Sequence, residues 1–186
     1  MSETNETIFR LGASEICLLQ GDITLETVDC IVNAANSRLA GGGGVDGAIH
    51  RRGGPKIMSQ TRLEFPNGCA TGDAVISGAG ALSARFVIHA VGPIWQGGQQ
   101  GEPELLAGAY RACLQLARDH DCRSIAFPAL SAGAYGYPAA LAAEIALATV
   151  REFVTKTSDP HLVRFALFTR EMFEQFHRTA IELFRS

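Results

Sequence analysis

Apolar positions along this chain fall into two kinds of pattern that alternate from one end to the other. Short apolar runs bounded by glycine, proline or aspartate predict strands, and apolar stripes at helical spacing predict helices. The predicted strands are 16–19, 30–32, 74–77, 85–90, 124–127 and 163–168. The predicted helices are 46–52, 55–64, 102–120, 139–154 and 171–184. This order predicts an α/β domain with helices on both faces of a largely parallel sheet.

The loops that follow the strands of such a sheet are where its ligands bind, beyond the carboxyl ends of the strands. Three distinctive loops follow predicted strands here, at residues 20–24, 33–45 and 128–137. Because parallel strands place their carboxyl ends at one edge, we expect the three loops to meet on one rim of the sheet.

Size and composition narrow the class of protein. The chain has 186 residues, which fits one domain, and we expect a frayed tail over residues 1–7 and a single domain over 8–186. Its 47% hydrophobic and 19% charged residues are typical of a globular protein. The net charge of −3, with no lysine or arginine run, argues against nucleic acid as the main partner.

The N-terminus and the cysteines indicate the cellular compartment in which we expect the protein. Residues 1–7 are polar and acidic, unlike a signal peptide, and the longest apolar runs are far shorter than a membrane span. We therefore expect a cytoplasmic protein with no membrane partner. The five cysteines are odd in number and lack C-x-x-C spacing, which favours reduced thiols over disulfides or a zinc site. We predict no metal, and we expect Cys17 and Cys30 to be core residues.

The stretch from Asn33 to Gly54 is the most informative part of the chain. Four consecutive glycines, 41–44, stand immediately before a predicted helix, and a glycine loop leading into a helix N-terminus is a ready anion site. No lysine follows the glycines, so the loop is not a Walker A motif. Residues 42–47 match G-x-G-x-x-G formally, but about eight residues separate them from the preceding strand. That context disfavours a dinucleotide-dependent oxidoreductase, which we keep as a third hypothesis.

Polar residues flank this loop, and each has two interpretations. Asp46 is either a helix cap or a functional carboxylate beside a phosphate site. Asn36 is suited to a hydroxyl-rich ligand through its amide, whereas we expect Asn33 to build the loop. Asp22 follows a strand, where an Asx turn or helix cap is favoured over a contact with an adenine amine.

A second loop of small residues, 131–138, lies between a strand and a long helix. It could present backbone to a phosphate, with Tyr135 closing over the ligand. A serine nucleophile elbow needs G-x-S-x-G, and the glycine before Ser131 is missing. Of the histidines, His50 lies one helical turn after Asp46 and is placed to orient the loop, whereas His89 lies in an apolar strand, as core histidines do.

Several segments together resemble a known family. They are residues 20–24, 31–54, 89–93 and 127–138, and they span nearly the whole chain in order. In these segments the chain resembles the macrodomain family, specifically the MacroD-type branch of bacterial ADP-ribose hydrolases. The resemblance implies a three-layer α/β/α domain around a mixed, largely parallel central sheet, with ADP-ribose bound in a cleft at the strand ends.

The resemblance also implies roles for individual residues. Asp22 and Ile23 would contact the adenine, and Phe168 would lie against it. The backbone of Gly43, Gly44 and Val45 would face the distal ribose and a phosphate. The loop made of Ser131, Ala132, Gly133, Ala134 and Tyr135 would wrap the diphosphate. Asn36 and Asp46 would act around the distal ribose during hydrolysis. In the family that this chain resembles, threonine and valine are usual at the positions of Ala132 and Ala134. We therefore expect a lower affinity for phosphate than is usual in that family.

These roles imply an ADP-ribose ester hydrolase that needs no cofactor. The expected reactions are deacetylation of O-acetyl-ADP-ribose and removal of mono-ADP-ribose from aspartate or glutamate of proteins. The expected partners are therefore ADP-ribose, its ester derivatives and mono-ADP-ribosylated proteins. The alternative is a module that binds ADP-ribose without chemistry.

Overall fold

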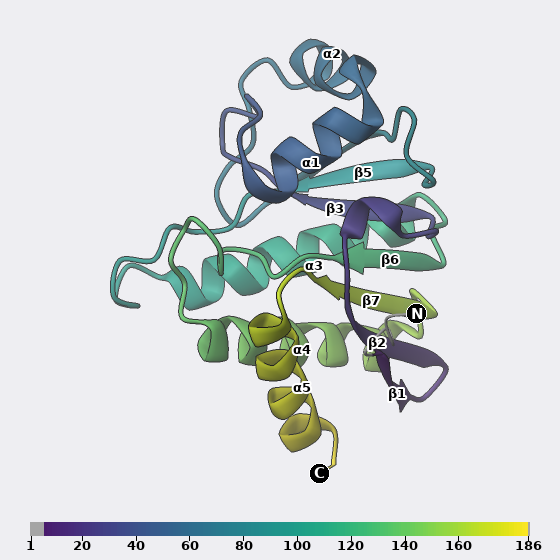
Figure 1. Cartoon of the computed structure of the whole chain (residues 1–186), viewed down its shortest axis with the longest axis vertical. Coiled ribbons are helices and arrows are strands. Elements are labelled where there is room, and N and C mark those ends of the chain that lie inside the picture. The colour runs from purple at the N-terminus through teal and green to yellow at the C-terminus, as the bar shows by residue number, and fades with distance from the viewer. Residues whose placement is uncertain (1–5, 186) are drawn as a thin grey trace.

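The computed structural model describes residues 6–185, which form one seven-stranded sheet covered by helices on both faces (Figure 1). The strands are β1 (Glu6–Leu11), β2 (Ser14–Gln20), β3 (Cys30–Ala34), β4 (Ala74–Gly78), β5 (Phe86–Ala90), β6 (Ser124–Phe127) and β7 (Leu162–Leu167). The helices are α1 (Gly44–Gly53), α2 (Pro55–Glu64), α3 (Glu102–Asp119), α4 (Ala139–Thr157) and α5 (Arg170–Phe184), with a short 3₁₀ helix, η1, at Ile23–Leu25.

The sheet is mixed and largely parallel, as the sequence predicted. Its strand order is β1-β2-β7-β6-β3-β5-β4. The strands from β2 to β5 in this order are parallel, and β1 and β4 run antiparallel at the two edges. The carboxyl ends of β2, β3 and β6 therefore lie at the same edge of the sheet. The expectation that the loops after these strands share one rim is confirmed.

Successive side chains of the central strands point to opposite faces of the sheet, and helices pack on both faces, which gives three layers. In β2, Ile16 and Leu18 belong to one buried cluster, and Cys17 and Leu19 belong to another. The first cluster contains the apolar faces of α3, α4 and α5, and the second contains Ile49 of α1 and Ile57 of α2. Because both faces of the central strands are buried, their sequences read as continuous apolar runs. The expected α/β/α architecture is confirmed (Figure 1).

The expected tail over residues 1–7 needs correction. Residues 1–5 lie outside the described part of the chain, but Glu6 and Thr7 belong to β1. β1 pairs antiparallel with β2 through a tight turn at Gly12. As an edge strand with no fully buried residue, β1 carries no apolar run, and its backbone pairing is set by β2.

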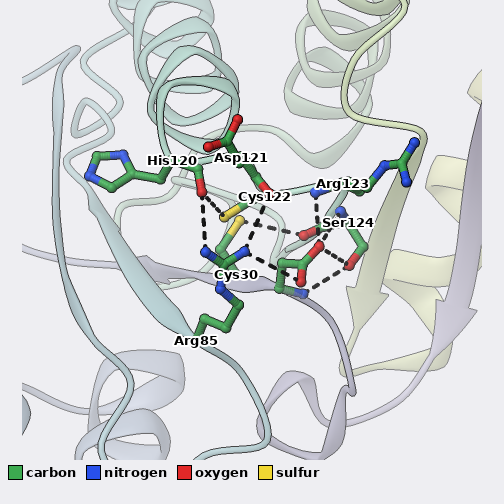
Figure 2. A network of polar contacts seen from close by, with 8 residues as sticks. Cys30, Arg85, His120, Asp121, Cys122, Arg123 and Ser124 are labelled. Carbon is green, nitrogen blue, oxygen red and sulfur yellow. Dashed lines mark hydrogen bonds and ion pairs between the residues drawn. The ribbon is translucent and has the colours of Figure 1, made fainter.

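At the edge of the sheet opposite the rim, polar contacts connect the segments that precede neighbouring strands (Figure 2). The Asp29 carboxylate accepts hydrogen bonds from the backbone N–H groups of Arg123 (2.8 Å) and Ser124 (3.1 Å). The Arg85 guanidinium donates to the carbonyls of His120 (3.4 Å) and Asp121 (3.3 Å). These contacts join the starts of β3, β5 and β6, so the strands are held in register away from the rim loops.

All five cysteines are buried and unbridged, and the expectation that Cys17 and Cys30 are core residues is confirmed. Over residues 6–185, no helix combines the length and the apolar character needed to cross a membrane.

Candidate active site

The loop between β3 and α1 is shaped by the side chain of Asn36. Its Nδ2 donates to the Gly41 carbonyl (2.9 Å), and its Oδ1 accepts from the backbone N–H groups of Arg38 and Ala40 (both 3.2 Å). Asn36 is therefore the residue that builds this loop. The prediction that Asn33 does so is wrong, because Asn33 lies in β3 and is fully buried.

The N-terminus of α1 faces the loop, and no side chain among residues 6–185 caps it. The helix begins at Gly44, whose φ of +54° favours glycine, and its N-cap is Gly43. The first N–H groups of a helix have no partner within the helix, and the helix dipole adds positive potential there. Asp46 lies in this first turn but does not cap it, so the cap interpretation of Asp46 is wrong. The uncapped helix end is suited to an anion.

The Asp46 carboxylate is held by one oxygen. Its Oδ1 accepts a hydrogen bond from Asn33 Nδ2 at 2.6 Å and lies 3.2 Å from His50 Nε2. The other oxygen, Oδ2, faces the glycine loop, where a Cβ on Gly42 would lie 3.4 Å from it. The residue is only 6% exposed. One oxygen of a buried carboxylate is thus anchored, and the other is turned toward the glycine loop.

Three buried side chains behind Asp46 were not among the predicted site residues. Asn33 Nδ2 lies 3.2 Å from His89 Nδ1, and His89 Nε2 lies 2.9 Å from Ser77 Oγ. We expected His89 to be a satisfied core residue, and its ring is indeed buried with both nitrogens in contact. The signal available in the sequence was one polar residue within each of three apolar strands, but the sequence does not reveal the register that brings them together.

The pH dependence of stability should report the burial of His89. Burial lowers the pKa of His89 from 6.5 to about 4, and the neighbouring His50 contributes to this. Because the unfolded chain binds this proton more readily, the stabilisation is complete above pH 6.5 and is lost as the pH falls toward 4. Relative to a His89→Asn variant, the wild type should lose about 3 kcal/mol of unfolding free energy across that window. Urea titrations at several pH values measure the unfolding free energy of both proteins. The prediction is contradicted if this free energy changes with pH in the same way for the wild type and for His89→Asn.

The second rim loop presents unpaired backbone N–H groups. Its start is fixed by Ser131, at a φ of +63°, whose carbonyl accepts from the Tyr137 N–H at 3.0 Å. The backbone N–H of Trp95 donates to the Tyr135 carbonyl at 2.9 Å. Within residues 6–185 the N–H groups of Gly133, Ala134 and Tyr135 donate to no protein group. Successive free N–H groups in a turn form an anion-binding nest.

This loop lies directly against the segment that follows β5. A Cβ on Gly92 would lie 2.2 Å from Ser131 Oγ, so only glycine fits there without displacing the serine. A cavity of about 270 Å³ opens beside this contact, bordered by Ser37 from the first loop and by Tyr135 from the second. The cavity therefore touches both the loop after β3 and the loop after β6, at the β5 end of the rim.

The opposite end of the rim carries Asp22 and Phe168. Asp22 Oδ1 accepts from the Thr24 N–H (2.9 Å) and hydroxyl (2.7 Å), which confirms the cap interpretation. Among residues 6–185, Asp22 Oδ2 accepts no hydrogen bond. The Gly21 N–H donates to the Leu167 carbonyl at 3.0 Å, which places Asp22 and Phe168 on adjacent loops. The Phe168 side chain is 75% exposed, whereas Ile23 is buried. An exposed ring beside a free carboxylate oxygen can receive a flat, amine-bearing group.

The predicted site residues thus lie along one rim of the sheet, from Asp22 and Phe168 at the β2–β7 end to Asp46 at the β3 end. Along this rim the loop 131–135 follows β6, and the loop 41–45 follows β3 and leads directly into Asp46. No cluster of residues able to hold a metal ion occurs within the described residues.

Comparison with known proteins gives consistent matches. A family model described as "Macro domain" matches residues 32–146. The O-acetyl-ADP-ribose deacetylase of Salmonella gallinarum is 54% identical over 160 residues, which cover 85% of this chain and 89% of that protein. The solved structure of an Oceanobacillus iheyensis macrodomain with ADP superposes with a TM-score of 0.93 at 38% identity and covers 99% of both chains. A Trypanosoma brucei macrodomain in complex with ADP-ribose gives a TM-score of 0.82 at 39% identity, over 88% of this chain and 68% of that one.

Proposed function

This chain belongs to the Macro domain family, and we propose that it is a hydrolase that binds ADP-ribose and cleaves ester-linked groups at the distal ribose. One observation carries the proposal. Asp46 is a buried carboxylate with one oxygen anchored by Asn33 and the other turned toward a glycine loop and an uncapped helix N-terminus. A carboxylate beside an anion site repels the anion, so its position there calls for a chemical role.

The proposed ligand runs along the rim. Its adenine lies on Phe168, with its amine at Asp22 and Ile23. Its phosphates lie against the loop 131–135 and the N-terminus of α1, and its distal ribose lies over residues 43–45. Asn36 acts by holding the glycine loop in shape and has one amide hydrogen left for the ribose. In the same proposal the described residues 6–185, with β1 included, act as one macrodomain.

The proposed reaction is ester hydrolysis by water. Asp46 Oδ2 orients or deprotonates the water, whose oxygen bonds to the ester carbonyl carbon. The bond between that carbon and the ribose oxygen then breaks, and the ribose oxygen leaves with a proton. Preformed N–H groups of the two loops hold the phosphates, so that the ester is fixed beside Asp46. The products are ADP-ribose and a carboxylic acid.

We extend the proposal to proteins carrying mono-ADP-ribose on aspartate or glutamate, because their linkage is also an ester to ribose. A module that binds without chemistry is the second candidate. The observation in its favour is that the Asn36 amide is already engaged within its loop. Binding of ADP-ribose without product release would support that candidate.

The test is to incubate the protein with O-acetyl-ADP-ribose and with a glutamate-linked ADP-ribosylated protein, and to quantify the ADP-ribose released. Release from both substrates supports the full proposal, and release from the first alone restricts it to the metabolite. Failure to release ADP-ribose from either would reject hydrolysis. Competition by NAD at similar concentration would instead favour the dinucleotide hypothesis.

Replacing Phe168 by alanine should weaken ADP-ribose binding without destabilising the fold. Stacking of a base on an aromatic ring contributes roughly 1–3 kcal/mol, so the Kd should rise about 5- to 150-fold. Calorimetry measures the change. Leu63→Ala on α2 removes an apolar side chain that is also exposed, and it should leave the Kd unchanged. An unchanged Kd for Phe168→Ala would remove the ring from the proposed adenine site.

A further inference from the structure

A row of buried polar side chains crosses three strands and ends at Asp46. Ser77 of β4, His89 of β5 and Asn33 of β3 are each at most 2% exposed. Strand alternation explains why they meet. Asn33 lies on the same face as Ile31, and His89 on the same face as Val87, which is the face covered by α1 and α2. Asn33 is also paired directly with His89 in the parallel register of β3 and β5. The row therefore points at α1, where Asp46 lies.

The proton positions along this row are determined by chemistry. An amide nitrogen only donates and a carboxylate only accepts, so Asn33 Nδ2 donates to Asp46 Oδ1 and to His89 Nδ1. A neutral His89 with an accepting Nδ1 carries its proton on Nε2, which then donates to Ser77 Oγ. The Ser77 hydroxyl in turn donates to the Gly78 carbonyl at 3.1 Å. Each group thus has one consistent role.

We infer that Ser77 and His89 are positioning residues for the proposed hydrolase: Ser77 fixes the tautomer of His89, and His89 fixes the Asn33 amide that aims the Asp46 carboxylate. This inference rests on the proposed function. Turning the Asn33 amide over would bring its oxygen to the Asp46 oxygen that now lies 2.6 Å from Asn33 Nδ2, and two acceptors at that distance repel.

Ser77 influences the position of the Asp46 carboxylate by determining which nitrogen of His89 carries the proton. Without the Ser77 hydroxyl, the Nε2–H group of His89 would be buried with no partner, and the other tautomer would become favourable. Its Nδ1–H would then face the N–H group of Asn33. The amide relieves that conflict by turning over, which points its oxygen at Asp46 and displaces the carboxylate.

The unpaired oxygen of Asn33 fits a positioning role. Asn33 Oδ1 is buried with no hydrogen-bond partner among the described residues, while Nδ2 makes both contacts. Leaving a buried amide oxygen unpaired costs free energy, and such groups gather where function needs a fixed arrangement. An amide that served stability alone would gain by pairing its oxygen.

The experiment compares Ser77→Ala with Ser77→Thr and Ser14→Ala. Loss of the Ser77 hydroxyl should lower kcat for O-acetyl-ADP-ribose roughly 10- to 100-fold, while KM and the Kd for ADP-ribose change by less than about twofold. Threonine keeps the hydroxyl and should restore kcat. Ser14 is equally buried and donates to the Pro160 carbonyl at the other edge of the sheet, so Ser14→Ala controls for loss of a buried hydroxyl. Nitrogen-15 NMR should show His89 as the Nε2–H tautomer in the wild type and a shift toward Nδ1–H in Ser77→Ala.

A wild-type kcat in Ser77→Ala, a loss matched by Ser14→Ala, or an Nδ1–H tautomer of His89 in the wild type would overturn the inference alone. Absence of turnover by the wild type would overturn the proposed function and the positioning role with it. The NMR result is independent of activity, so the two failures are distinguishable.

Discussion

Replacing Asp46 by asparagine is expected to lower the turnover of O-acetyl-ADP-ribose by about 10²- to 10⁴-fold, the range contributed by a positioned acid or base. Asparagine has nearly the same shape, and its amide oxygen can still accept the hydrogen bond from Asn33. The variant therefore keeps the site folded and removes only the charge that orients or deprotonates water. ADP-ribose should bind as well as before or more tightly, because a negative charge beside its phosphates is gone.

Kinetics and calorimetry on the same preparation separate the two effects. Asp119→Asn, an exposed aspartate at the end of α3, is the matched control and should change neither quantity. Equal turnover by the wild type and Asp46→Asn would exclude Asp46 from the chemistry. A parallel loss of turnover and of binding would instead assign Asp46 to holding the ligand.

Replacing Phe165 by alanine is expected to lower the free energy of unfolding by about 3–5 kcal/mol, as for other large core aromatics. Phe165 is fully buried in β7, with ring centroids 5.6 Å from Phe127 and 5.4 Å from Phe176. Removing the ring leaves a cavity between the sheet and α5. Rigid strands on either side, β2 and β6, prevent the cavity from closing.

Urea unfolding measures this loss, and Phe168→Ala provides the internal control. The two phenylalanines are three residues apart, but Phe168 is largely exposed and its removal should leave stability nearly unchanged. A similar loss in both variants would mean that the Phe168 ring is buried in solution. A loss below about 1 kcal/mol for Phe165→Ala would show that the core relaxes around the gap.

Most of the fold could be predicted because its elements are encoded locally. The strand 124–127 and the helix 55–64 have the predicted bounds, and the others differ by a few residues at their ends. Both faces of the central strands are buried, which makes their sequences stand out as apolar runs. The strand β1 was missed because an edge strand is held by backbone pairing to β2 and needs no apolar face.

The location of the candidate site residues on one rim of the sheet could be predicted from the sequence. Their side-chain contacts could not. Glycines before a helix and small residues after a strand predict anion-binding backbone wherever the chain folds, since that property belongs to the backbone itself. The parallel topology then places both loops on one rim. The roles of side-chain amides cannot be predicted in this way, because they depend on hydrogen-bond partners that are distant in the sequence.

The order of strands and helices, the two loops 41–45 and 131–135 and the carboxylate of Asp46 can all be recognised in the local sequence. The roles of the polar side chains follow from the assembled fold. Asn33 and Asn36 are three residues apart and chemically identical, yet one anchors Asp46 from inside the sheet and the other builds the loop. The reason is that β3 directs Asn33 to the α1 face and the register of β5 sets His89 beside it, whereas Asn36 lies beyond the strand end. Register and facing are properties of assembled strands, so the partner of a buried amide exists only once the sheet has formed.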